Sequence, residues 1–149
     1  MALVIHLKRN GQIIINGAVL ENLSGRTISF CVKNDAAILR DRDILKAEEA
    51  TTPATRVYFA LQCMYLFPHR RNEHAAQFAE LFESFRQAVP SADPIAAEVR
   101  AALAAGNDYA ALKHAQSLIQ HEGKILRHVH DRLVENLQHD PAAGKSASD

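Results

Sequence analysis

The chain has little of what marks several large classes of protein. Its 149 residues include no tryptophan, two cysteines, six glycines and five prolines, and aromatic residues make up only 6%. No apolar run is long enough to cross a bilayer, and the first seven residues are too short and too alternating for a secretory signal. Cys31 and Cys63 lack metal-ligand spacing and are predicted to be reduced, packed thiols. We therefore expect a cytoplasmic protein that does not associate with membranes.

Motifs of common enzymes are also absent from the sequence. It has no phosphate-binding glycine loop, no serine in a nucleophile elbow and no zinc-type spacing of Cys and His. His114, His121 and His128 recur every seven residues on one predicted helix, which separates neighbours by roughly 10 Å at the helical rise per residue. One metal ion needs its ligands within about 2 Å, so these histidines are expected to be solvated. We predict a non-enzyme with no cofactor and no metal.

Residues 1–45 show the alternation that is typical of short β-strands. Apolar and polar residues alternate over residues 3–7 and again over 26–33. Asn16-Gly17 is a strong two-residue hairpin signal because both positions tolerate positive φ, and Asn10-Gly11 is a second turn of this kind. Five short strands bury little apolar area alone, so they need the rest of the chain or a second subunit. We predict a small antiparallel β meander, barrel-like in form.

Residues 46–138 carry the signals of about four α-helices. Thr52 before Pro53 is an N-cap followed by proline at the first helical position. The helices are predicted to run from Pro53 to about Leu66, from near Asn72 to before Pro90, from Asp93 to Gly106, and from Asp108 to about residue 138. Asp108 is expected to cap the last of them. The prediction is an α+β fold with a β lobe at 1–45, a helical lobe at 46–138 and a disordered tail at 139–149.

The charge is unevenly distributed along the chain, although the formal net charge is zero. Through Arg71 there are ten Lys/Arg and six Asp/Glu, a balance of +4. From Asn72 onward there are seven Lys/Arg and eleven Asp/Glu, a balance of −4. Such asymmetry indicates nucleic-acid binding by the basic half. Ordinary scatter of surface charge explains it equally well from the residues alone.

Three segments of the sequence resemble the FlbT family of flagellin-synthesis regulators. They read LVIHLKRNGQIIINGAV, ILRDRDIL and ATTPATRVYFALQCMYL, and the resemblance extends over roughly residues 3–133. One departure is Gln12 after Gly11, where the family usually has an acidic residue. The resemblance implies a cytoplasmic, non-enzymatic regulator of flagellum biogenesis. It also implies association with the 5′ untranslated region of flagellin mRNA, with repressed translation or faster message degradation.

The basic half supplies the candidate contacts to such an RNA. They are Lys8, Arg9, Arg26, Lys33, Arg40, Arg42 and Arg56. Arginine suits phosphates and base edges because its planar fork forms paired hydrogen bonds, although charged residues on strands also prevent edge-to-edge aggregation. Stacking on unpaired bases is an alternative role for Tyr58, Phe59 and Tyr65, but we favour the interpretation that they pack in the core. The short strands, the KRNG turn and RDRDIL also resemble the carbon-storage regulator family of RNA-binding β dimers.

A second class of function is open, that of a protein-binding adaptor. Leu112, Ile119, Leu126 and Leu133 recur every seven residues and form a stripe longer than the preceding helix can cover. Leu126 and Leu133 are therefore the candidate protein contacts. The expected occupant is flagellin, another flagellar factor or a second copy of the chain as a homo-oligomer.

Overall fold

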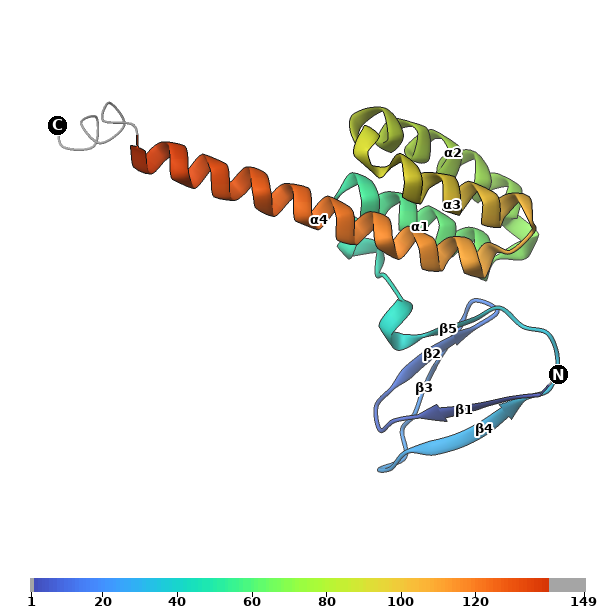
Figure 1. Ribbon diagram of the computed structural model, residues 1–149. Helices are drawn as coiled ribbons and strands as arrows, with labels where there is room; N and C mark the ends of the chain where they lie inside the picture. The colour runs from blue at the N-terminus through green and yellow to red at the C-terminus, as the bar shows by residue number, and fades with distance from the viewer. Residues whose placement is uncertain (1, 140–149) are drawn as a thin grey trace.

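The computed structural model describes residues 2–139, which form a β lobe and a helical bundle (Figure 1). The strands are β1 (Leu3–Leu7), β2 (Gln12–Ile15), β3 (Ala18–Glu21), β4 (Ile28–Val32) and β5 (Ile38–Arg40). The helices are α1 (Pro53–Leu66), α2 (Arg71–Ala88), α3 (Asp93–Ala104) and α4 (Asp108–His139), with short 3-10 turns at η1 (Asp41–Asp43), η2 (Ala47–Glu49), η3 (Pro68–Arg70) and η4 (Pro90–Ala92). The α+β prediction is confirmed. The predicted tail lies outside the described residues from 140 onward, and His139 is the last residue of α4.

The strands form two small antiparallel sheets. β1 pairs with β4 in one sheet, and β2 pairs with both β3 and β5 in the other. Asn16 and Gly17, with φ of 50° and 83°, form the predicted hairpin turn between β2 and β3. Asn10-Gly11 also turns the chain, but it leads from one sheet to the other and joins no paired strands. The strand order therefore differs from a sequential meander, because β1 and β2 each find a partner far along the chain.

The β3–β2–β5 sheet is the middle layer of the molecule. Ile13 packs with Ile5 and Leu7 in a core between the two sheets. Its neighbour Ile14 points to the opposite face, because side chains alternate along a strand. There Ile14 and its register partner Leu39 belong to the core of the helical bundle. β2 is thus buried on both faces, and the two parts of the protein share a hydrophobic core.

α1 is the central element of the helical bundle. It packs against α2 and α4, while α3 packs against α4. The Thr52 hydroxyl accepts a hydrogen bond from the backbone N–H of Thr55 at 3.2 Å, which confirms the predicted cap. α2 contributes Phe78, Phe82 and Phe85 to the core. The helical boundaries thus lie close to those that local sequence signals predict.

The prediction is wrong about which residue caps the start of α4. Asn107, and not Asp108, caps the helix, because its side-chain oxygen accepts the backbone N–H of Ala110 at 3.0 Å. Asp108 instead accepts two hydrogen bonds of 2.9 Å from the guanidinium of Arg71. Asp108 is the first residue of α4, and its carboxylate pairs with Arg71 instead of capping the helix.

Cys31 also differs from its prediction. It is exposed on β4, while Cys63 is half-buried in α1. The reason is alternation along the strand, since Phe30 and Val32 on either side of Cys31 pack against the core of the β lobe. The expectation of a packed thiol is therefore wrong for Cys31.

Side chains of α1 hold the last strand and the segment that follows it. The Tyr65 hydroxyl accepts the backbone N–H of Ile38 and donates to its carbonyl, both at 3.0 Å. Gln62 forms the same paired contact with the backbone of Leu45, with both hydrogen bonds at 2.9 Å. These contacts satisfy backbone groups that no neighbouring strand covers and fix β5 against the helical bundle.

The turn at Gly17 provides a test of this packing. Gly17 has φ of 83°, and an added Cβ would lie 2.7 Å from Cε1 of Phe67. We expect Gly17→Ala to lower the free energy of unfolding by about 2 kcal/mol, measured by urea denaturation. Gly106→Ala measures the cost of positive φ alone, since φ is 75° there and no atom lies within 4 Å. Gly25→Ala has neither a positive φ nor a close contact and is the baseline. A Gly17→Ala protein that loses no more stability than Gly106→Ala would contradict the close approach to Phe67.

Candidate nucleic-acid interface

An open groove lies at one edge of the β lobe. The register pairs Ile13 with Arg40, so Arg40 points to the same side of its sheet as Ile13, toward β1 and β4. The groove has a volume of about 460 Å³, and Ile5, Leu7 and Ile13 form its apolar floor. Arg40 is thus the last inward-facing residue of β5, and it lies where the core of the β lobe opens to solvent.

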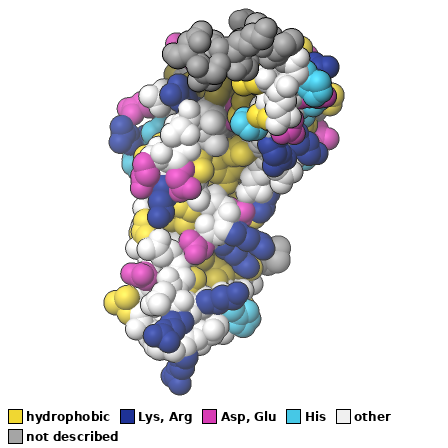
Figure 2. Space-filling view, turned by 90° about the vertical axis from the view of Figure 1, so that its left-hand side faces the viewer, with side chains coloured by type: hydrophobic (Ala, Val, Ile, Leu, Met, Phe, Trp, Pro, Cys, Tyr) yellow, Lys and Arg dark blue, Asp and Glu magenta, His cyan; other side chains and the backbone are white. Residues whose placement is uncertain are grey.

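Three basic side chains line this groove. Lys8 comes from the end of β1, Arg40 from the end of β5 and Arg42 from η1, with His6 and Asp41 beside them. Within residues 2–139, none of the three forms an ion pair with an acidic side chain. In the lower part of Figure 2, Lys and Arg side chains gather around an apolar area of the β lobe. We call this feature the basic groove.

Asn22 holds two further basic residues close to the basic groove. Its buried side-chain amide donates to the backbone carbonyls of Leu7 at 3.0 Å, Lys8 at 3.1 Å and Arg26 at 2.8 Å. The loop that carries Arg26 is therefore fastened beside the end of β1, where Arg9 follows Lys8. Five of the seven candidate contacts thus come together at one end of the β lobe, and they are Lys8, Arg9, Arg26, Arg40 and Arg42.

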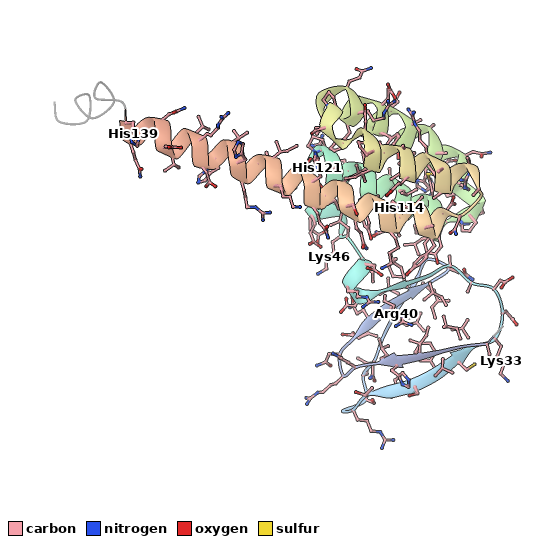
Figure 3. The ribbon with its side chains drawn as sticks, viewed as in Figure 1. Lys33, Arg40, Lys46, His114, His121 and His139 are labelled. Atoms are coloured by element: carbon pink, nitrogen blue, oxygen red, sulfur yellow. The ribbon has the colours of Figure 1, made fainter. Side chains whose placement is uncertain are left out.

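Lys33 and Arg56 lie elsewhere. Lys33 follows β4 beyond the pair Leu3–Val32, whereas Lys8 follows the other end of β1, so they are roughly 20 Å apart along the strand direction. Figure 3 shows Lys33 and Arg40 at separate places on the β lobe. Arg56 lines a different hollow, between α1 and α2. The structure therefore does not bring these two residues to the basic groove.

An aromatic surface borders the other side of Arg40 and Arg42. A second hollow of about 420 Å³ is lined by these two arginines together with Tyr65 and Tyr109. The two tyrosine rings lie 5.7 Å apart, and the ring of Tyr109 is exposed. Tyr58, by contrast, is a core residue whose pKa is raised to about 12 by burial. Sequence reasoning missed Tyr109, because no local signal indicates that the start of α4 lies beside β5.

A buried carboxylate lies next to the basic groove and is hydrogen-bonded to residues of α4. Asp43 accepts hydrogen bonds from Nζ of Lys113 at 3.0 Å and from Nε2 of Gln116 at 2.8 Å. Burial would raise the pKa of the Asp43 carboxyl, but these hydrogen bonds and the charges of Lys113 and Arg42 outweigh it, so the pKa is lowered. Asp43 is therefore charged, and its side-chain hydrogen bonds go to Lys113 and Gln116 of α4, while Arg42 acts on it only through its charge.

The two candidate protein contacts lie far from this surface. Leu126 and Leu133 are both exposed on the half of α4 that projects beyond the bundle (Figure 1). Among residues 2–139, no group of three His, Cys, Asp or Glu side chains is placed to hold a metal ion. In the same part of the chain, no helix is long and apolar enough to cross a membrane.

Known proteins resemble the chain over most of its length. A family model described as flagellar protein FlbT matches residues 3–126. A protein of Bradyrhizobium diazoefficiens, named probable flagellum biosynthesis repressor protein FlbT 1, is 38% identical over 125 residues, or 84% of this chain and 85% of the relative. A probable flagellum biosynthesis repressor of Caulobacter sp. strain K31 is 33% identical over 131 residues, or 87% of this chain and 99% of the relative. The flagellum biosynthesis repressor of Caulobacter vibrioides is 32% identical over 133 residues, which cover 87% of this chain and 92% of the relative. No solved structure matches the chain significantly.

Proposed function

The chain belongs to the FlbT family of flagellar proteins, and we propose that it represses flagellum biosynthesis by binding the 5′ untranslated region of flagellin mRNA. The main observation that supports RNA binding is the basic groove. Lys8, Arg40 and Arg42 arrive there from separate elements, and within residues 2–139 no acidic side chain pairs with them. Cationic side chains left without protein partners are suited to phosphate groups.

The surroundings of the basic groove favour a single strand over a duplex. Its apolar floor and the neighbouring Tyr65 and Tyr109 offer surfaces for unpaired bases, while the arginines contact the backbone. A 5′ untranslated region, or leader, that is bound in this way would be withheld from the ribosome or presented for degradation. The proposed activity is binding without a chemical step, and its place is the cytoplasm, where the message is translated.

A salt titration of RNA binding tests the proposal. A labelled flagellin leader RNA should bind the full chain with an affinity that falls as salt rises, with a log–log slope near −3 if Lys8, Arg9, Arg40 and Arg42 each contact a phosphate. Arg40→Gln combined with Arg42→Gln should weaken binding at least tenfold and reduce the slope to about half. Fluorescence anisotropy at several salt concentrations measures both quantities, and circular dichroism checks that the variant is folded.

A matched control removes the same charge from elsewhere. Lys33→Gln combined with Arg56→Gln also deletes two positive charges, but from positions away from the basic groove. This variant should bind the leader within about twofold of the unaltered chain, because non-contacting charges act only at long range. Equal losses in both double variants would assign binding to overall charge. Unchanged affinity in the Arg40/Arg42 variant would remove the basic groove from the site.

A specific observation favours a second candidate function, that of an adaptor for flagellin or another flagellar factor. Large apolar side chains, Leu126 and Leu133 among them, are exposed on the projecting half of α4. This surface is distant from the basic groove, so one protein has room for both an RNA and a protein partner (Figure 1). Such an arrangement would allow a protein partner to control repression.

A further inference from the structure

The two halves of α4 have opposite surroundings. In the first half, Leu112, Ala115 and Leu118 are buried against α1 and α3. Every residue from 126 to 139 is exposed, although the helix continues without a break past Gly123. Figure 1 shows this second half extending away from the bundle and from the β lobe. The family model ends at residue 126, so this half lies almost entirely beyond the part that the model matches.

The projecting half carries an apolar strip on one face. Leu126, Val129, Leu133 and Leu137 follow each other at steps of three and four residues, which places them on one side of a helix. Their exposed fractions are 55%, 48%, 56% and 66%. Four large apolar side chains in one row are costly to leave in water, so the row indicates an interaction surface. We call these four residues the α4 strip.

Positive charge borders the α4 strip on both sides. Arg127 comes one residue after Leu126, and Arg132 one residue before Leu133, so at about 100° per residue they flank the strip in opposite directions. Neither arginine forms an ion pair with another residue of the described part, 2–139. The acidic residues of this half, Asp131 and Glu135, fall on the far face, roughly 150° or more from the middle of the strip.

We propose that the α4 strip binds an amphipathic helix of a partner protein whose apolar stripe is bordered by Asp and Glu. Such a helix would cover the four apolar side chains while its carboxylates pair with Arg127 and Arg132. A second copy of this chain fits less well. It would bring two more arginines to the contact and no acidic residue beside its own strip.

A membrane surface also fits the α4 strip less well than a protein helix. Helices that lie on anionic membranes have strongly basic polar faces and commonly insert Trp or Phe. Residues 123–139 contain no aromatic Phe, Tyr or Trp, and their three Lys/Arg are offset by two Asp/Glu. The partner is therefore expected to be a protein. This binding does not depend on the basic groove, which lies on the other part of the molecule.

Two synthetic helical peptides test the proposal directly. Both have the same leucine stripe, bordered by Glu in one and by Lys in the other. The full chain should bind the Glu-bordered peptide at least tenfold more tightly, as measured by fluorescence anisotropy. Arg127→Glu combined with Arg132→Glu should reverse that preference, and Leu126→Asp combined with Leu133→Asp should abolish binding. Lys124→Glu, a charge reversal on the far face, should leave the preference unchanged.

Several results would overturn the proposal. Equal affinity for the two peptides, or no binding of either, would exclude recognition of an acidic border. Dimers of the unaltered chain in analytical ultracentrifugation that the Leu126/Leu133 variant loses would assign the strip to a second copy. Binding to phosphatidylserine vesicles that the same variant loses would assign it to a membrane. The charge-reversal variant keeps all apolar contacts, so its reversed preference remains decisive even if the Asp variant unfolds.

Discussion

Replacing Leu39 with alanine is expected to lower the free energy of unfolding by about 3 kcal/mol and to destabilise both parts of the molecule together. Leu39 is 0% exposed although it lies on a strand of three residues. With Ile14 it packs into the core of the helical bundle, so the middle sheet is part of that core. Two sheets of two and three short strands bury too little surface to be stable alone. Loss of the shared core should therefore unfold strands and helices in one transition.

Two probes are needed to measure this effect. Circular dichroism during urea denaturation follows the helices, and amide hydrogen exchange follows β1, β2 and β5 separately. Leu20→Ala is the matched control, because it makes the same change at an exposed position of β3 and should cost less than about 1 kcal/mol. Helices that keep their original midpoint while the strands of the Leu39→Ala protein exchange freely would show that the two parts fold independently.

The helices could be predicted closely because their signals are local. Thr52 and Pro53 begin α1 as expected, and Gly106, with φ of 75°, follows the end of α3. Caps act through hydrogen bonds within three or four residues, so the sequence contains the whole interaction. The cap of α4 shows the limit of such local reasoning. Asn107 and Asp108 are both suitable caps, and in the structure Asn107 caps the helix while Asp108 pairs with Arg71, which is 37 residues away.

Strand pairing could not be derived in the same way. Alternation and turn residues correctly indicated five strands, but pairing of β1 with β4 is decided by which faces become buried together. The run Ile13-Ile14-Ile15 breaks the alternation, which is typical of a strand buried on both faces. That pattern indicates that the strand lies in a middle layer of the fold, but it does not show which elements pack against its two faces. The long-range packing of β2 therefore had to come from the structure.

The candidate RNA contacts were predictable as a set of charges but not as a surface. Arg40 and Arg42 stand out in the sequence because they are basic residues at and just after the end of a strand. Only the register of β5 against β2 shows that Arg40 points into an open groove. The same register explains why Lys33 is left at the other end of the lobe. Residues that contribute through tertiary contacts, such as Asn22, carry no local sequence signal.

The second large effect is expected at Asp43, where Asp43→Ala should lower the free energy of unfolding by about 2 to 3 kcal/mol. The carboxylate joins η1 to α4 through Lys113 and Gln116, and the Tyr58 hydroxyl donates to the Asp43 backbone carbonyl. Without the carboxylate, Lys113 loses its acceptor and Gln116 keeps only its 3.3 Å contact with the Tyr58 hydroxyl, both in a partly buried place. Asp41→Ala, an exposed neighbour on the same turn, is the matched control and should change stability little.

The contribution of Asp43 should also depend on pH in a defined direction. Its pKa is lower in the folded protein than in the unfolded chain, where an aspartate titrates near pH 4. The stabilisation is therefore fully present above about pH 4 and is lost as the pH falls through the lower, folded pKa. Urea denaturation of the unaltered protein and of Asp43→Asn, from neutral to acidic pH, should give a stability difference that is constant near neutrality and shrinks below about pH 4. A difference that stays constant into the acidic range would show that the charge of Asp43 is not what joins η1 to α4.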